Sequence, residues 1–148
     1  MGVQTGTIYI WDDCNMIYEQ YFTNVNPYTA AIYQGLFVSS HYYPAFFANT
    51  NYIPAGQKVF DARFKAYTSA AASTNVYTNT NGSGTSETGI TYANQGNGGT
   101  YYSNYNTVAS GWTNWDFTSL VQTWVNNSTP KWFHCLSVYD TQVSYLSG

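Results

Sequence analysis

The side chains able to do chemistry are few, and none has the spacing of a catalytic motif. His41 and His134 are the only histidines, and Cys14 and Cys135 are the only cysteines. A zinc site needs three or four nitrogen, sulfur or carboxylate ligands, while adjacent His134 and Cys135 face opposite sides of a strand. No G-x-S-x-G elbow and no local Ser, His and Asp arrangement occurs. The sequence therefore predicts no metal site, no cofactor and no catalytic residue.

Seven acidic residues leave two carboxylate chemistries to weigh. Asp12 and Asp13 could give oxygen ligands to calcium, but no spaced set of carboxylates follows them, which favours a solvated turn. A carboxylate pair could also hydrolyse a polysaccharide. Glu87 and Asp116 lie where a turn residue and a helix cap are expected. A polysaccharide-acting hydrolase is therefore the weaker alternative for the function.

Aromatic side chains are the main candidates for binding, because 20% of the chain is Phe, Trp or Tyr and 16 residues are Tyr. Trp and Tyr stack on sugar rings and anchor protein interfaces. Six of them have polar, loop-like surroundings and form the candidate binding surface: Tyr42, Tyr43, Tyr101, Tyr102, Tyr105 and Trp112. The same side chains could instead be core or subunit contacts, and both interpretations stay open.

One short helix is expected near residues 117–126, in a chain that is otherwise strand and loop. Asp116 or Thr118 could accept hydrogen bonds from the first free amides. Asn127 would tolerate a left-handed exit. The apolar residues recur with the helical period, which predicts that Trp124 and Leu120 pack under a β-sandwich. The whole stripe is Leu120, Val121, Trp124 and Val125.

Residues 59–67 have the clearest strand pattern. Strict alternation predicts that Phe60 and Phe64 are buried while Asp61, Arg63 and Lys65 are exposed. Together with the helix, the strands predict one domain over residues 1–148, an all-β, antiparallel, jelly-roll-like sandwich. The other expected strands are residues 7–11, 35–39, 42–47, 70–77, 89–92, 101–103 and one or more within 132–146.

The composition restricts the class of partner and compartment. Charged residues are only 7% of the chain, which is typical of extracellular walls, fibres and virion shells. Four Lys and Arg side chains are too few to neutralise several phosphates, so no nucleic acid partner is expected. No signal peptide and no membrane span is predicted. Cys14 and Cys135 could form a disulfide between the two ends, or stay two buried thiols.

Three segments carry a family resemblance: IPAGQKVFDARFKAY at residues 53–67, ETGITYANQ at 87–95 and WDFTSLVQTWVN at 115–126. In this order and spacing they resemble the DNRLRE-type domain over about residues 36–140. Ser86 and Tyr92 stand where that family usually has Trp. The resemblance implies a jelly-roll β-sandwich related to carbohydrate-binding modules.

Two functions from different classes follow. The first is a non-enzymatic structural assembly protein of an extracellular or virion surface, such as a capsid decoration or cement protein or a fibre subunit. Its partner would be itself or another coat protein in a homo-oligomer, with a trimer expected if it decorates a shell. The second is a carbohydrate-binding module with a glycan as its ligand.

Overall fold

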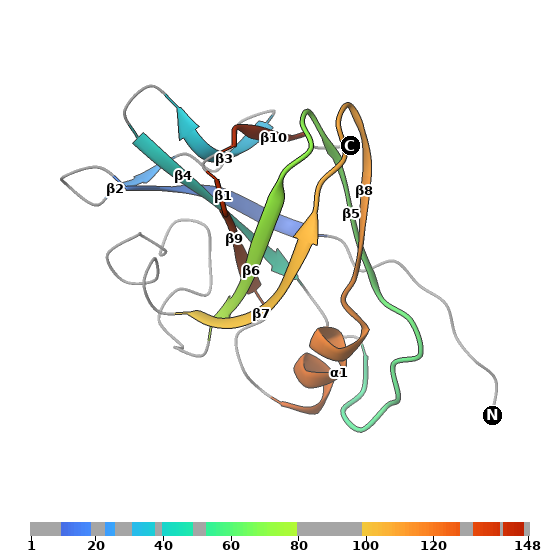
Figure 1. Cartoon of the computed structure of the whole chain (residues 1–148). Helices are drawn as coiled ribbons and strands as arrows, with labels where there is room; N and C mark the ends of the chain where they lie inside the picture. Colours follow the sequence, from blue (N-terminus) through green and yellow to red (C-terminus); the bar gives the residue numbers. More distant parts are fainter. Residues whose placement is uncertain are drawn as a thin grey trace.

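A computed structural model of the chain describes residues 10–18, 23–25, 31–37, 40–48, 53–79, 99–127, 132–139 and 141–146. These residues form an all-β sandwich with antiparallel pairing throughout and one short helix, as the sequence predicted (Figure 1). The elements are β1 (Ile10–Tyr18), β2 (Thr23–Val25), β3 (Ala31–Phe37), β4 (Ser40–Ala48), β5 (Arg63–Thr68), β6 (Ser73–Asn79), β7 (Gly99–Asn106), β8 (Gly111–Asp116), α1 (Thr118–Asn126), β9 (Trp132–Ser137) and β10 (Val143–Leu146).

Strand β4 is where the sheet divides into two layers. Along one edge it pairs with β1, from residue 41 to residue 48. Its other edge pairs first with β3 at residues 40–42 and then with β9 at residues 45–47. From β9 the sheet continues to β6 and β7, which we call the first wing. From β3 it continues to β10, β5 and β8, which we call the second wing.

The two wings face each other and enclose an aromatic core. Figure 1 shows β6 and β7 opposite β5 and β8, with α1 at one end of the sandwich. Phe133 of β9 lies edge-on to Phe64 of β5, with ring centroids 5.2 Å apart, and Phe46 of β4 contacts both rings. Burial of such large rings is the dominant favourable term in a fold of this kind.

The seam between the edge strands β7 and β8 is closed by side chains. The rings of Tyr105 and Trp115 stack with centroids 5.2 Å apart. The indole N–H of Trp115 donates to the carbonyl oxygen of Asn106 at 2.9 Å, and the hydroxyl of Tyr105 donates to the carbonyl oxygen of Asp116. Each edge strand thus gives a backbone acceptor to a side chain of the opposite wing.

The alternation predicted for residues 59–67 is confirmed from Arg63 onward and wrong for Phe60. Phe64 is buried, while Asp61, Arg63 and Lys65 are exposed. Phe60, however, is 66% exposed, with the ammonium group of Lys58 5.2 Å from its ring centroid. The reason is that β5 begins only at Arg63, so the two-residue period does not extend back to Phe60.

Helix α1 covers one end of the sandwich with the predicted apolar stripe. Its buried residues are Leu120, Val121, Trp124 and Val125. At the start of the helix, Asp116 accepts a hydrogen bond from the first free amide as predicted, since its carboxylate oxygen binds the Thr118 N–H at 3.0 Å, although the N-cap residue itself is Phe117. The end of the helix differs from the prediction. The chain leaves the helix in an extended conformation at Asn127, with φ of −121°.

The disulfide considered for Cys14 and Cys135 is not formed, since Cys135 is a buried free thiol. The register explains this. Cys14 of β1 pairs with Ala45 of β4, and Ala45 pairs on its other side with His134 of β9. One strand therefore separates the two cysteines, which places their backbones about 10 Å apart and beyond the reach of a disulfide. The strand predicted at residues 89–92 lies outside the described residues.

Truncation of the helix anchor tests the role of α1. Trp124→Ala should lower the free energy of unfolding by about 3–5 kcal/mol, because it leaves a cavity between the helix and the wings. Urea denaturation followed by fluorescence measures the change. The exposed Trp112→Ala serves as the matched control and should cost less than about 1 kcal/mol. A loss that small for Trp124→Ala would contradict the packing of α1.

Candidate functional surface

Three turns meet at the end of the sandwich opposite α1 (Figure 1). The backbone N–H of Val138 donates to the carbonyl oxygen of Ser73, and that of Thr107 donates to the carbonyl oxygen of Ala72, both at 3.0 Å. The hydroxyl of Thr107 in turn accepts from the N–H of Ala72 at 2.9 Å. These bonds hold the β5–β6, β7–β8 and β9–β10 connections side by side at one surface.

This surface carries exposed apolar side chains, which we call the turn-end patch. Trp112 is 62% exposed and Tyr139 is 79% exposed. Val108 and Val138, each 41% exposed, complete the patch. Apart from Asp140, which is not described, the turns carry no charged residue. Large apolar side chains left exposed on neighbouring turns and at the start of a strand are typical of an interaction site.

A second surface is the outer face of β5 and β8, which we call the β5–β8 face. Cross-strand pairing places Tyr67 opposite Trp112, Lys65 opposite Asn114, and Arg63 opposite Asp116. The Tyr67 and Trp112 rings meet edge to face with centroids 5.8 Å apart. The Tyr67 hydroxyl donates to the carbonyl oxygen of Ser110 at 3.0 Å, where Ser110 has a left-handed backbone (φ 50°). An aromatic pair, an ammonium group and a carboxamide therefore follow one another along this face.

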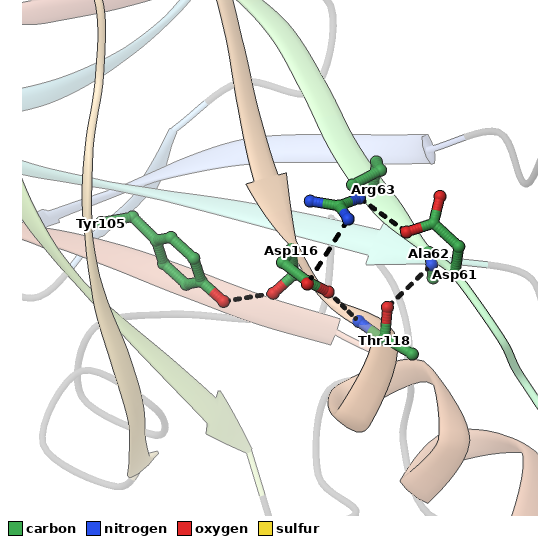
Figure 2. Close-up of polar contacts among 6 residues, drawn as sticks. All are labelled: Asp61, Ala62, Arg63, Tyr105, Asp116 and Thr118. Carbon is green, nitrogen blue, oxygen red and sulfur yellow. Dashed lines mark hydrogen bonds and ion pairs between the residues drawn. The ribbon is translucent and has the colours of Figure 1, made fainter.

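The far end of the β5–β8 face is occupied by an ion-pair cluster (Figure 2). The guanidinium group of Arg63 binds Asp61 at 2.7 Å and lies 3.6 Å from Asp116. Hydrogen bonds from the backbone and hydroxyl of Thr118, and then the charge of Arg63, lower the pKa of Asp116 below its usual value of 3.8. A general acid needs the opposite shift, so this carboxyl is suited to anchoring the helix and not to proton donation.

The structure distributes the six predicted aromatic residues over different surfaces. Trp112 belongs to both surfaces described above. Tyr101 is exposed on the outer side of the first wing, where its ring contacts Tyr77. Tyr102 and Tyr105 are half-buried at the seam, packed against the core. The remaining two lie half-buried on β4 and also have partners: Tyr42 and Tyr43. They do not form one platform.

Several residues of these two surfaces were missed by the sequence interpretation. Tyr67 lay in a segment whose alternation was used only to find the core, although the same pattern puts its ring on the outer face. Tyr139 and Val138 were assigned to a closing strand, whereas they form a turn after β9. No local sequence pattern marks Val108 as exposed, because the surface to which it belongs is formed by three turns that are distant in sequence.

The described part of the chain contains no group of three or more His, Cys, Asp or Glu side chains placed to hold a metal ion. Within the same residues, no helix is long and apolar enough to cross a membrane. No protein-family model matches the chain, and no curated protein sequence matches it at a significant level.

His134 is buried on the face of β9 that is turned away from the aromatic core, since its neighbours Phe133 and Cys135 face that core. Its ring stacks on Tyr77 with centroids 5.3 Å apart. Gly99 of β7 lies so close that an added Cβ would be 2.9 Å from Cε1 of His134 and 2.7 Å from Cβ of Tyr77. Burial lowers the pKa of His134 from 6.5 to about 4. The imidazole is therefore neutral in the folded protein at neutral pH.

This burial predicts an acid-sensitive fold. Because the unfolded chain binds the His134 proton more tightly, the free energy of unfolding should fall by about 3 kcal/mol as the pH drops from 6.5 to 4. The change can be measured by urea denaturation across that range. His134→Phe keeps a ring against Tyr77 without a titrating group, so its stability should depend less on pH. Equal pH dependence in both proteins would contradict the assignment.

Proposed function

We propose that the protein is a non-enzymatic structural subunit of an extracellular or virion surface. In this role it would be a capsid decoration or cement protein or a fibre subunit, bound to copies of itself or to a coat protein. The observation that carries the proposal is the turn-end patch, in which Trp112 at the start of β8, Val108 in the β7–β8 turn, and Val138 and Tyr139 in the β9–β10 turn are all exposed.

The low charge of the chain supports association through this patch. Only 7% of residues are charged, so little electrostatic repulsion keeps copies apart. Trp and Tyr provide large contact areas with few rotatable bonds, which lowers the entropy lost on binding. A closed symmetric oligomer would bury the patch of every copy, and a trimer suits a shell with three-fold positions.

The rest of the described chain also favours a binding role over catalysis. Asp61 and Asp116 are exposed acids held by one arginine. The three segments that resemble a DNRLRE-type domain favour the second candidate, a carbohydrate-binding module, since the resemblance implies a jelly-roll β-sandwich related to such modules. Membership of that family is part of the proposal and rests on this resemblance.

The turn-end patch can be removed without touching the core. Trp112→Ala combined with Tyr139→Ser should weaken self-association by about 30-fold or more, as expected for the loss of an aromatic hot spot of about 2 kcal/mol. Sedimentation over a wide range of concentration measures the dissociation constant. Phe60→Ser is the matched control, because Phe60 is as exposed as Trp112 but lies beside α1 at the opposite end.

The control should leave association unchanged. If both variants weaken association equally, exposed apolar area in general drives it and the patch has no special role. A strictly monomeric wild-type protein that is absent from every particle or filament of its source would contradict the structural function.

A carbohydrate-binding module is the second candidate, and the β5–β8 face favours it. The exposed Trp112 ring, supported by Tyr67, can stack on a sugar ring. Lys65 and Asn114, one pair further along, offer hydrogen-bond donors and an acceptor to sugar hydroxyls. Rows two residues apart lie about 7 Å from each other, so a ligand contacting both would be an oligosaccharide and not one monosaccharide.

The two functions share Trp112 but can be separated by other residues. Lys65→Ala with Asn114→Ala should abolish glycan binding by a module, as measured by calorimetry with oligosaccharides, and leave association unchanged. Tyr139→Ser should do the reverse, weakening association alone. Micromolar glycan binding by a monomer, lost on Lys65→Ala with Asn114→Ala, would replace the structural proposal with this one.

A further inference from the structure

A neutral polar network lies at the centre of the core, between the wings. Gln34 of β3 and Thr74 of β6 are fully buried, and Tyr145 of β10 is 2% exposed. The side-chain nitrogen of Gln34 donates to Oγ1 of Thr74 at 2.8 Å. The hydroxyl of Tyr145 donates to the side-chain oxygen of Gln34 at 2.7 Å. One carboxamide is thereby held between a hydroxyl and a phenol, away from water.

These groups are those of an acyl transfer reaction. The Gln34 carboxamide carbon is an electrophile, and the Thr74 hydroxyl is a nucleophile already in contact with the same amide. The Tyr145 phenol donates to the amide oxygen, where negative charge develops when the carbon is attacked. Buried glutamine is uncommon, and an amide serving only to fill the core would be replaced by an apolar side chain at no loss.

We propose that Thr74 and Gln34 form an intramolecular ester cross-link. In the reaction the bond between Oγ1 of Thr74 and Cδ of Gln34 forms, and the bond between Cδ and Nε2 of Gln34 breaks. The hydroxyl proton of Thr74 leaves with the nitrogen, so the products are the ester and one molecule of ammonia. No oxidant, cofactor or second substrate is required.

Tyr145 provides a path for the protons that creates no buried ion. Its hydroxyl interacts with Thr74 as well as with Gln34, and burial raises its pKa well above the usual value, so it stays a neutral proton donor. It can accept the Thr74 proton while giving its own to the amide oxygen, and reverse the transfer when ammonia leaves. Cδ lies on the axis of the last side-chain torsion, which is a broad rotor, so a partial rotation breaks the hydrogen bond from Nε2 to Oγ1 and turns the face of the carbonyl carbon toward Oγ1.

The core supplies the remaining requirements. Holding both reactants in contact raises their effective concentration by orders of magnitude, and only one turnover in the life of the chain is needed. Exclusion of water protects the ester from hydrolysis, and ammonia that escapes into solution does not return. Cys135 is also near Tyr145, but burial raises the pKa of its thiol, which disfavours the thiolate as a competing nucleophile.

The bond would join β3 to β6, residues 40 positions apart in the chain. β3 belongs to the branch that leads into the second wing, and β6 is the middle strand of the first. An ester here would hold the two layers together covalently. The inference is independent of the proposed function, because a cross-link is detected in the isolated chain whether or not that chain assembles.

Intact mass spectrometry of the purified full chain tests the cross-link. Folded wild-type protein should be lighter than its sequence mass by one ammonia, about 17 Da. Proteolysis should yield one fragment containing both residues 34 and 74, which mild hydroxylamine separates because it attacks esters much faster than amides. Thr74→Val should have its full sequence mass, whereas Thr74→Ser retains a nucleophile and should still lose ammonia.

Two further variants distinguish the chemistry from general effects on the core. Thr113→Val removes a buried hydroxyl whose partner is Thr68 at 2.7 Å and not an amide, and it should keep the mass deficit. Tyr145→Phe should slow ammonia loss by about 100-fold or more. A folded wild-type protein at full sequence mass after prolonged incubation at neutral pH would overturn the proposal and leave a hydrogen-bonded network only.

Discussion

The edge of β4 that faces away from β1 is shared by β3 and β9, and this sharing determines the rest of the molecule. Two strands cannot continue one flat sheet from the same edge, so the sheet separates into two wings that turn toward each other. The aromatic core fills the space between the wings, α1 covers one end and three turns cover the other. This division of the sheet at β4 positions both surfaces proposed for binding. It also positions the network around Gln34.

A second constraint is the scarcity of charge. Polar groups in this chain are mostly amides and hydroxyls, and these can be buried where ions cannot, provided that they are hydrogen-bonded. Gln34, Thr68 and Thr74 accordingly lie inside the sandwich, each bonded to another buried side chain. Three of the described charged groups meet at the exposed start of α1, where Arg63 joins the carboxylates of Asp61 and Asp116 (Figure 2).

Features that depend on local periodicity were predictable from the sequence, and features that depend on long-range meeting of segments were not. Trp124 and Phe64 stand in strict helical and strand patterns, and both are buried as expected. The burial predicted for Phe60 was wrong, because alternation of apolar and polar residues does not mark the residue at which a strand begins. Gln34 gave no signal, because its role comes from Thr74 and Tyr145, which lie 40 and 111 positions away. The turn-end patch could not be predicted as one surface either, because its residues come from turns that are distant in sequence.

The seam between β7 and β8 has a consequence for the protein at high concentration. Edge strands with free backbone groups are templates for the addition of further strands, and a chain rich in Tyr, Asn and Thr is at risk of forming cross-β aggregates. Here the carbonyl oxygens of Asn106 and Asp116 already accept from Trp115 and Tyr105. An incoming strand would have to displace these bonds and unstack both rings. The seam therefore works as a barrier to strand addition at the edges of β7 and β8.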